Sequence, residues 1–418
     1  MNRINNCKAA FSQIDITPDY PVELIGGYRE DSQSGGILHR LCAQILLFEF
    51  GDERSCIIAI DSLGLTTKLS DELRSLIAQT LGSPVSRIML NYSHTHSAPA
   101  PLSPLNGQKY FTQLCSGVVK AAQQALLLLQ PCLIGWAVTE SELAENRREG
   151  CSLVDRRFGA IQIVNEANSS PIALILRVNA HANILMRDNN LSSDYFGMTR
   201  DKLSDELGCP AMLLQGASGN LKPTGVDTLS GGTLQDVERI SQLILQDARR
   251  LQFKPGVVER LKMYSKEIEF YSDVPSKEQA FQIADEARNR FGIDGAEWLN
   301  ECERLRQADI AYQVQRSEIQ FFFLNEGCIC GLPDEIFCEI SLEVSLRAES
   351  KLLFLNGYTN GCTGYLPHLE EWEKGGYETL YSYLMYYPFH GHVMPFQKDT
   401  AQRIVELVET EWHSGLNW

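Results

Sequence analysis

The chain has 418 residues, which is enough for two or three average domains or for one large α/β unit. Hydrophobic residues make up 44% of it, so a sizeable core can form, and Asp plus Glu outnumber Lys plus Arg by 53 to 37. The resulting formal net charge of -16 argues against a general nucleic-acid-binding surface, so we expect no nucleic-acid partner.

Apolar runs rich in β-forming residues alternate with helical patterns along most of the chain. We predict strands at residues 41–50, 56–63, 87–91, 132–138, 159–164, 172–179, 212–215, 319–324 and 352–356. We predict helices at residues 70–81, 110–129, 199–207, 233–251, 335–348 and 400–411. This order favours an α/β fold with mixed β-sheets flanked by helices. We expect a single domain over 1–418, with a helical insertion at about 276–315.

The cysteines and the N-terminal residues bear on the cellular compartment. The twelve cysteines are scattered through apolar runs and lack the spacing of a metal or redox motif, so we interpret them as reduced core residues. Residues 1–19 contain no stretch typical of a secretory signal, and no run reaches the roughly 18 apolar residues that a membrane span needs. We therefore expect a cytoplasmic protein without a transmembrane segment.

The most informative segment is Asn-Tyr-Ser-His-Thr-His-Ser-Ala-Pro at residues 91–99, directly after the apolar run 88–90. Side chains at i and i+2 of an extended segment point the same way, so His94 and His96 can face one pocket while Thr95 faces away. One imidazole could hold a metal while the other acts on a substrate. Alone the motif is weak, because two hydrogen-bonded loop histidines would give the same pattern.

Further polar segments lie where predicted strands end. His181 follows the strand that ends near residue 178, and Glu335 stands in a turn before a helix that we expect to begin near residue 336. Each also has a structural interpretation, as a buried histidine or as an acidic first turn favoured by the helix dipole. The tract 356–367 is rich in Gly and Asn and holds tyrosines, which either line a polar pocket or only pack.

Taken in order, these residues resemble the neutral/alkaline, non-lysosomal ceramidase family over most of the chain. The motifs that carry the resemblance are Asp15-Ile16-Thr17-Pro18, Gly26-Gly27-Tyr28, Ser93-His94-Thr95-His96-Ser97, Asn146-Arg147, His181, Gln215-Gly216-Ala217-Ser218-Gly219-Asn220, Pro333-Asp334-Glu335, Gly364-Tyr365 and Tyr377-Glu378. The resemblance implies the fold of the ceramidase catalytic domain and the hydrolysis of a carbon–nitrogen amide bond.

The resemblance also implies one catalytic zinc ion per chain. Its ligands would be His94, His181, Glu335 and Tyr365. The scissile carbonyl would be surrounded by His96, Arg147 and Tyr377. Two neutral imidazoles and a carboxylate are a common catalytic zinc set, and zinc lowers the pKa of bound water toward about 7. His96 or Tyr377 would donate to the oxyanion and later to the leaving nitrogen, and Arg147 would supply fixed positive charge.

The loop after the strand 212–215 departs from the family. Ceramide-cleaving members carry Gly-Asp-x-Ser-Pro there, with the serine at the active centre, whereas this chain has Gly219-Asn220-Leu221-Lys222-Pro223. Lysine does not simply replace a hydroxyl nucleophile, since its ammonium stays protonated unless burial lowers its pKa. The chemistry then relies on zinc alone, or the substrate differs, or activity is lost. Lys222 would favour an anionic substrate if it faced the pocket; the alternative is a solvent-facing lysine.

Several weaker expectations complete the site. Asn220, Asp61 and His39 are candidates for contacts to the substrate or to a metal-binding histidine, with His39 near the pocket mouth. The pair His390 and His392 lies outside the matched motifs and would contribute at most behind the ligands or from a loop. The residues after Tyr377 cannot hold a β-sandwich domain, which takes roughly 100 residues, so we expect only a catalytic domain.

These observations predict a zinc-dependent, ceramidase-like amidohydrolase acting on a small-molecule amide or lipid-like substrate. Without membrane-directed features, ceramide itself becomes a less favoured substrate. Two alternatives remain open at this point: an esterase or lactonase acting on a small polar or sugar-derived molecule, and a non-catalytic relative that binds a metal or ligand. A homo-oligomer is compatible with the sequence.

Overall fold

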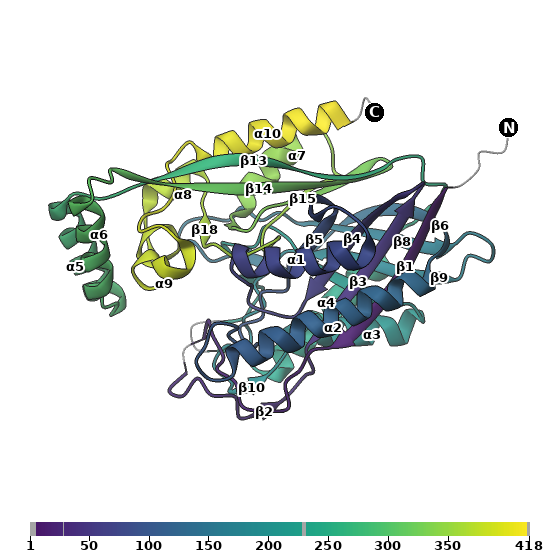
Figure 1. Ribbon diagram of the computed structural model, residues 1–418, viewed down its shortest axis with the longest axis horizontal. Coiled ribbons are helices and arrows are strands. Elements are labelled where there is room, and N and C mark those ends of the chain that lie inside the picture. Colours follow the sequence, from purple (N-terminus) through teal and green to yellow (C-terminus); the bar gives the residue numbers. More distant parts are fainter. Residues whose placement is uncertain (1–5, 28, 228–230, 416–418) are drawn as a thin grey trace.

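Two β-sheets lie face to face in the computed structural model of the protein, and helices cover their outer faces (Figure 1). The described residues are 6–27, 29–227 and 231–415. Tyr28, which belongs to one of the motifs quoted above, lies outside them. This arrangement confirms the predicted α/β class with mixed sheets flanked by helices.

The larger sheet consists of eight strands. They are β1 (Cys7–Asp15), β3 (Cys42–Phe50), β4 (Glu53–Ile60), β5 (Ile88–Tyr92), β6 (Gln130–Glu140), β8 (Arg157–Asn165), β9 (Pro171–Val178) and β11 (Ala211–Gln215). Their order across the sheet is β11-β9-β8-β6-β1-β3-β4-β5. The pairs β9–β11 and β4–β5 are parallel and the others antiparallel. The loops that follow β5 and β9 are joined by a main-chain hydrogen bond from His96 to the carbonyl of Ala182 at 3.1 Å.

The smaller sheet has four strands and is accompanied by three short pairs. The four, in spatial order, are β13 (Leu261–Asp273), β14 (Tyr312–Leu324), β15 (Gly327–Gly331) and β17 (Leu353–Asn356). The short pairs are β2 (Gly36–Ile37) with β10 (Asn190–Leu191), β7 (Ala144–Asn146) with β12 (Leu221–Pro223), and β16 (Glu335–Ile336) with β18 (Tyr365–Leu366).

Helices pack on the outer face of each sheet. The α-helices are α1 (Thr67–Leu81), α2 (Gly107–Leu128), α3 (Asp194–Leu207), α4 (Leu234–Arg249), α5 (Lys277–Phe291), α6 (Ala296–Gln307), α7 (Cys338–Arg347), α8 (Leu369–Lys374), α9 (Tyr383–His390) and α10 (Thr400–Gly415). A 3-10 turn covers Val85–Arg87 and a π-helix covers Tyr377–Tyr381. Within the described ranges, no helix combines the length and the apolar character needed to cross a membrane.

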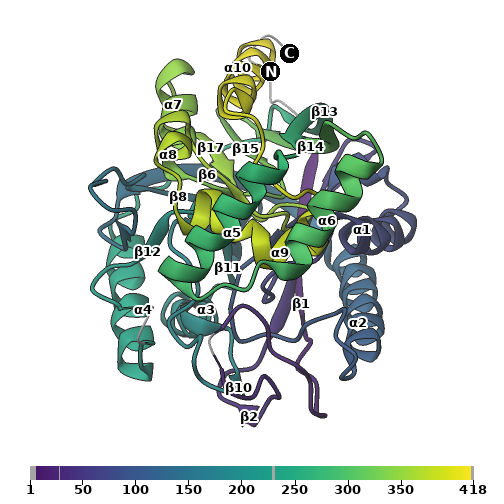
Figure 2. The same ribbon diagram turned by 90° about the vertical axis from the view of Figure 1, so that its left-hand side faces the viewer.

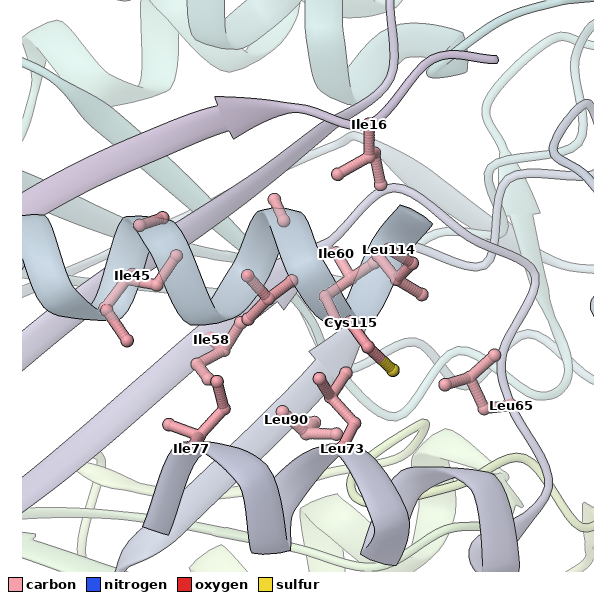
Figure 3. Close-up of a cluster of buried hydrophobic side chains, with 14 of the residues drawn as sticks. Ile16, Ile45, Ile58, Ile60, Leu65, Leu73, Ile77, Leu90, Leu114 and Cys115 are labelled. Atoms are coloured by element: carbon pink, nitrogen blue, oxygen red, sulfur yellow. The ribbon is translucent and has the colours of Figure 1, made fainter. Parts of the chain in front are cut away.

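The alternation of side chains along the central strands explains the layers. In β3, Ile45 and Leu47 point toward α1 and α2, whereas Leu46 and Phe48 point toward the smaller sheet. Figure 3 shows the first of these interfaces, where side chains from α1 and α2 meet those of β3, β4 and β5. Strands buried on both faces require apolar residues at nearly every position, which is why these segments stand out as apolar runs.

Helices α5 and α6 form a hairpin at the far end of the β13–β14 ribbon (Figure 1), and in Figure 2 this hairpin lies in front of α9. The indole of Trp298 is fully buried there and donates a hydrogen bond to the carbonyl of Val393 at 2.7 Å. Tyr381 of the π-helix and Leu384 of α9 belong to the same apolar cluster. The hairpin therefore backs the part of the chain that forms one wall of the site.

Two features differ from the sequence-based prediction. Strands β1 and β13 were not predicted, because Ala, Lys, Ser and Glu interrupt their apolar pattern. β1 is held in the sheet chiefly by pairing with β3 over nine residues. The helix expected from about residue 336 begins at Cys338 instead, and Glu335 lies in β16. Glu335 therefore pairs with Tyr365 of β18 and does not form the acidic first turn of the helix.

Candidate metal centre

Three histidines from two strand ends meet beneath a cavity. His94 and His96 follow β5, and His181 follows β9. One nitrogen of each ring lies within 4.8 Å of the corresponding nitrogen of the others. The His94 ring meets the His96 and His181 rings edge-on, with centroids 4.8 Å apart in both cases. The group is therefore compact enough to share one metal ion.

The two histidines of the His-x-His motif face the same pocket, but not for the reason that an extended segment would give. His94 has a φ of 61°, which places it in the left-handed region, and β5 has already ended at Tyr92. Thr95 does face away, since its hydroxyl donates to the carbonyl of Ser192 at 2.7 Å. The left-handed backbone of His94 therefore brings the two rings into contact. Strained residues of this kind are common at functional sites.

Main-chain carbonyls hold all three rings. The Nδ1 atoms of His94, His96 and His181 lie 2.6, 2.5 and 2.7 Å from the carbonyl oxygens of Leu63, Gly26 and Ser218. A carbonyl only accepts, so each Nδ1 carries the hydrogen, and in a neutral ring Nε2 then holds the lone pair. Three lone pairs then point into one space, which is the arrangement that metal-ligating histidines adopt.

Glu335 adds a carboxylate to this group. Its Oε2 lies 3.3 Å from Nε2 of His94 and 3.2 Å from Nε2 of His181. Burial alone would raise the pKa of Glu335, but the neighbouring His94 and His181 outweigh it and hold the pKa well below its usual value. The carboxylate is thus anionic at neutral pH, in the state that binds a metal.

Two of the histidines, His96 and His181, are held in the neutral state. Burial lowers the pKa of His181 to about 4, with the charge of Arg147 acting in the same direction. Burial also holds the pKa of His96 well below its usual value. Among the described residues, Nε2 of His96 has no hydrogen-bond partner and Nε2 of His181 faces only the Glu335 carboxylate at 3.2 Å, although both nitrogens are sealed from solvent. Buried acceptors of this kind fit a metal ion, which would satisfy them.

Tyr365 and Arg147 lie beside this group. Tyr365 stands opposite Glu335 in the parallel register of β16 and β18, so two of the predicted ligands are neighbours. The Arg147 guanidinium donates to the Tyr365 hydroxyl at 3.1 Å and to the carbonyl of Gly219 at 2.8 Å, and it forms an ion pair with Glu378 at 3.0 Å. Arg147 is buried behind Tyr365 and is not among the residues that line the cavity.

A cavity of about 370 Å³ opens over the cluster. Its lining includes His94, His96, Glu335, Tyr365 and Tyr377, together with mostly apolar residues. The apolar wall is formed chiefly by Ile25, Leu63, Leu65, Leu69, Ala100, Leu102, Tyr386 and Phe389. A mostly apolar pocket with a few convergent polar groups is typical of a small-molecule site. The arrangement can therefore hold an apolar arm of a ligand while a polar bond lies near the histidines.

Comparison with known proteins bears on the fold. No protein-family model matches this chain, and no curated protein matches it. Among solved structures, the chain is similar to neutral ceramidase from Pseudomonas aeruginosa, with 17% identity and a TM-score of 0.71 over 97% of this chain and 74% of the other. A structure of ceramidase complexed with C2 gives the same values. The protein has the neutral ceramidase fold. The resemblance inferred from the motifs is confirmed at this level.

Lys222 does not occupy the cavity of this ceramidase fold. Its ammonium lies 2.8 Å from the carboxylate of Glu145 and donates to the carbonyl of Val226 at 2.9 Å. The side chain therefore points from β12 toward β7 and the surface, which corrects the hypothesis that it contacts an anionic substrate. Asn220 is fully buried and donates to both carboxylate oxygens of Glu339, at 3.0 and 2.8 Å, so it is structural in its contacts.

Asp61 and His39 also lie elsewhere than expected. Asp61 is paired with Arg200 at 3.0 Å and accepts a hydrogen bond from the main chain of Cys42 at 2.8 Å. The predicted link between Asp61 and a metal-binding histidine is therefore wrong, because main-chain carbonyls fill that role. His39 bonds to Ser192 at 3.2 Å and is not among the cavity-lining residues, so its predicted place at the pocket mouth is wrong as well.

Two further residues lie at the site: Tyr358, which had no assigned role in the sequence analysis, and His390, which was expected at most behind the ligands or in a loop. The Tyr358 ring lies 4.5 Å from that of His94, and its hydroxyl is 3.2 Å from Ser218 Oγ and 3.5 Å from Glu335. The Gly- and Asn-rich tract that contains Tyr358 was the available signal. His390 lines the cavity, and the spacing of His390 to His392 was the signal for it.

Proposed function

We propose that the protein is a zinc-dependent hydrolase that cleaves the amide bond of a substrate with an apolar arm. The observation that carries this proposal is the convergence of three histidine Nε2 atoms and one carboxylate beneath an apolar cavity. Imidazole nitrogen with one carboxylate is a donor set that suits zinc. When bound, the metal would polarise the carbonyl and lower the pKa of a water molecule, which is the chemistry that amide hydrolysis needs.

Two ligand sets are compatible with this geometry. One is His94, His181 and Glu335 with Tyr365, in which His96 is left to contact the substrate. The other uses all three histidines. We favour the first, because Glu335 lies within 3.3 Å of both His94 and His181 and because His96 lines the cavity, where it can hold a proton near the leaving nitrogen. Tyr377 lines the cavity as well and can donate to the developing oxyanion.

Arg147 acts through Tyr365 in this proposal. Its guanidinium is held by Glu378 and donates to the Tyr365 hydroxyl. Arg147 therefore orients that hydroxyl toward the cluster and does not contact the substrate itself. A serine nucleophile at position 222 is not needed when water is the attacking group. The departure at Lys222 therefore leaves the reaction intact.

An ester would be cleaved by the same groups, and a protein that only binds ligands would keep the pocket without turnover. The apolar wall favours an amide with a hydrocarbon arm over a small sugar-derived lactone. The buried cluster also argues against a relative that has lost its metal, because the sealed Nε2 of His96 would then have no partner and would destabilise the fold.

Metal content, measured by plasma mass spectrometry on the purified protein, tests the proposal. We expect about one zinc per chain in the wild type, and a loss in His94→Ala and Glu335→Ala. His368→Ala serves as the control, since the His368 imidazole lies 3.3 Å from Glu343 and does not line the cavity. His96→Ala distinguishes the ligand sets: it should keep zinc but lose hydrolysis of an N-acyl amide. A wild type that binds no metal after zinc resupply would exclude the metallohydrolase.

A further inference from the structure

One wall of the cavity comes from α9, whose last residue is His390. His390 lines the cavity together with Tyr386 and Phe389 of the same helix, yet only 9% of its surface is exposed. Its ring packs on Gly364, where an added Cβ would lie 2.8 Å from the imidazole. Gly364 directly precedes Tyr365, so His390 stands beside the candidate metal ligands and within the same cavity.

One polar atom of the His390 ring has no partner in the described part of the protein. Among the described residues, its Nδ1 is sealed from solvent without a hydrogen-bond partner. The neighbouring His392 differs, since its Nδ1 donates to the carbonyl of Met394 at 2.6 Å and it does not line the cavity. Tyr383 holds the His390 ring from behind, edge-on with centroids 5.0 Å apart, and its own hydroxyl donates to the carbonyl of Tyr365. A buried imidazole fixed in this way fits a ligand.

The surroundings define the charge of that ligand. Burial, together with His392, lowers the pKa of His390 to about 3, so the imidazole is neutral near pH 7. The residues described as lining the cavity include two carboxylates, Glu23 and Glu335, and no Lys or Arg. An anionic group would therefore meet no protein cation there, and a neutral imidazole suits a group that is itself uncharged, such as a hydroxyl.

We propose that His390 is a substrate-binding residue that forms a hydrogen bond with an uncharged hydroxyl group carried close to the scissile bond. The inference rests on the proposed hydrolase function and adds a determinant of specificity to it. Because His390 is only 9% exposed, a substrate that lacks the hydroxyl leaves its imidazole without a partner. Discrimination by such a site is strong, because the buried polar group stays unpaired with the wrong substrate.

Matched substrates test the assignment. One pair is an N-acyl ethanolamine and the N-acyl propylamine with the same acyl chain; the other is a 2-hydroxyacyl amide and its deoxy form. We expect the wild type to hydrolyse the hydroxylated member of at least one pair with a kcat/KM about tenfold higher. His390→Phe should abolish that preference, mainly through KM, and His390→Asn should retain part of it.

Phe389→Leu is the matched control, because Phe389 lies on the same helix and lines the same cavity without a polar atom. It should keep the hydroxyl preference, and all variants should keep the wild-type zinc content. If His390→Phe does not fold, His390→Asn carries the comparison. The same preference in His390→Phe as in the wild type, or no preference in the wild type for either pair, would overturn the assignment. Loss of zinc or of all turnover in the wild type would instead defeat the proposed hydrolase, and calorimetric binding of the two pairs would then test His390 by itself.

Discussion

Glu378 links the candidate site to a buried ion-pair network, and its removal is the sharpest test of how Tyr365 is positioned. Its two carboxylate oxygens contact Arg147 at 3.0 Å and Arg148 at 2.9 Å. Arg148 has a second partner in Glu371 at 2.8 Å, whereas Glu378 is the carboxylate paired with Arg147 among the described residues. The substitution Glu378→Gln therefore leaves the Arg147 guanidinium buried without its counter-ion.

The expected magnitude follows from burial. Removing one partner of a buried ion pair costs about 3–5 kcal/mol. The side chains of Arg147 and Glu378 retain 16% and 12% exposure, and glutamine still offers one acceptor, so we expect about 2–3 kcal/mol here. For a chain of this length that corresponds to a melting temperature lower by about 3 °C. Because the Tyr365 hydroxyl then loses its fixed donor, kcat should fall by about 10–100-fold.

Glu371→Gln is the matched control. Glu371 is more deeply buried than Glu378, with 3% against 9% of the residue exposed, and it contacts Arg148, but it lies on α8 and is not paired with Arg147. Thermal unfolding should show a loss of stability in both variants, whereas hydrolysis of an N-acyl amide should fall only in Glu378→Gln. Equal activity in Glu378→Gln and the wild type, or an equal loss of activity in both variants, would refute the positioning role of Arg147.

Three further outcomes are expected. Burial alone would raise the pKa of Asp155, but the ion pairs with two arginines lower it to about 2. The ionised carboxylate therefore stabilises the folded protein above pH 4, and this contribution is lost as the pH falls toward 2. In urea unfolding, the stability difference between wild type and Asp155→Asn should narrow by about 2 kcal/mol over that range, and a constant difference would contradict this. Lys222→Ser should leave kcat/KM within about twofold, because the side chain points away from the cavity and its ion pair is partly exposed. Gly364→Ala should destabilise the protein by about 2 kcal/mol, measured in urea. The added Cβ would lie 2.8 Å from the His390 ring, and the φ of 104° at this position is strained for any residue other than glycine.

The sequence was sufficient to predict the elements that carry the strongest periodic signal. β3, β4 and β9 are continuous apolar runs because both of their faces are buried, and α1 and α2 have one buried stripe each. β13 could not be predicted in this way, since half of its length projects as a ribbon with polar side chains. Only its pairing with β14 over thirteen residues makes it a strand.

The candidate site was predictable where residues follow strand ends and not where they depend on distant packing. His94, His96 and His181 each come shortly after an apolar run, and contacts between the two loops, such as the main-chain hydrogen bond from His96 to the carbonyl of Ala182 at 3.1 Å, bring them together. The directions of Lys222 and Asp61 are set by partners far away in the chain, Glu145 and Arg200, which no local pattern reveals. His390 reaches the cavity only because the α5–α6 hairpin supports α9 from behind.

The way in which the histidines are held bears on how the site tolerates sequence change. Each Nδ1 donates to a main-chain carbonyl, so the identity of the residue that supplies that carbonyl matters little to the orientation of the ring. Leu63 and Ser218 could be exchanged for other residues without loss of these bonds. Gly26 could not, because its φ is 82° and an added Cβ would lie 2.9 Å from Nδ1 of His96. A site oriented by backbone thus depends on the path of the chain more than on neighbouring side chains, which is compatible with a shared fold at 17% identity.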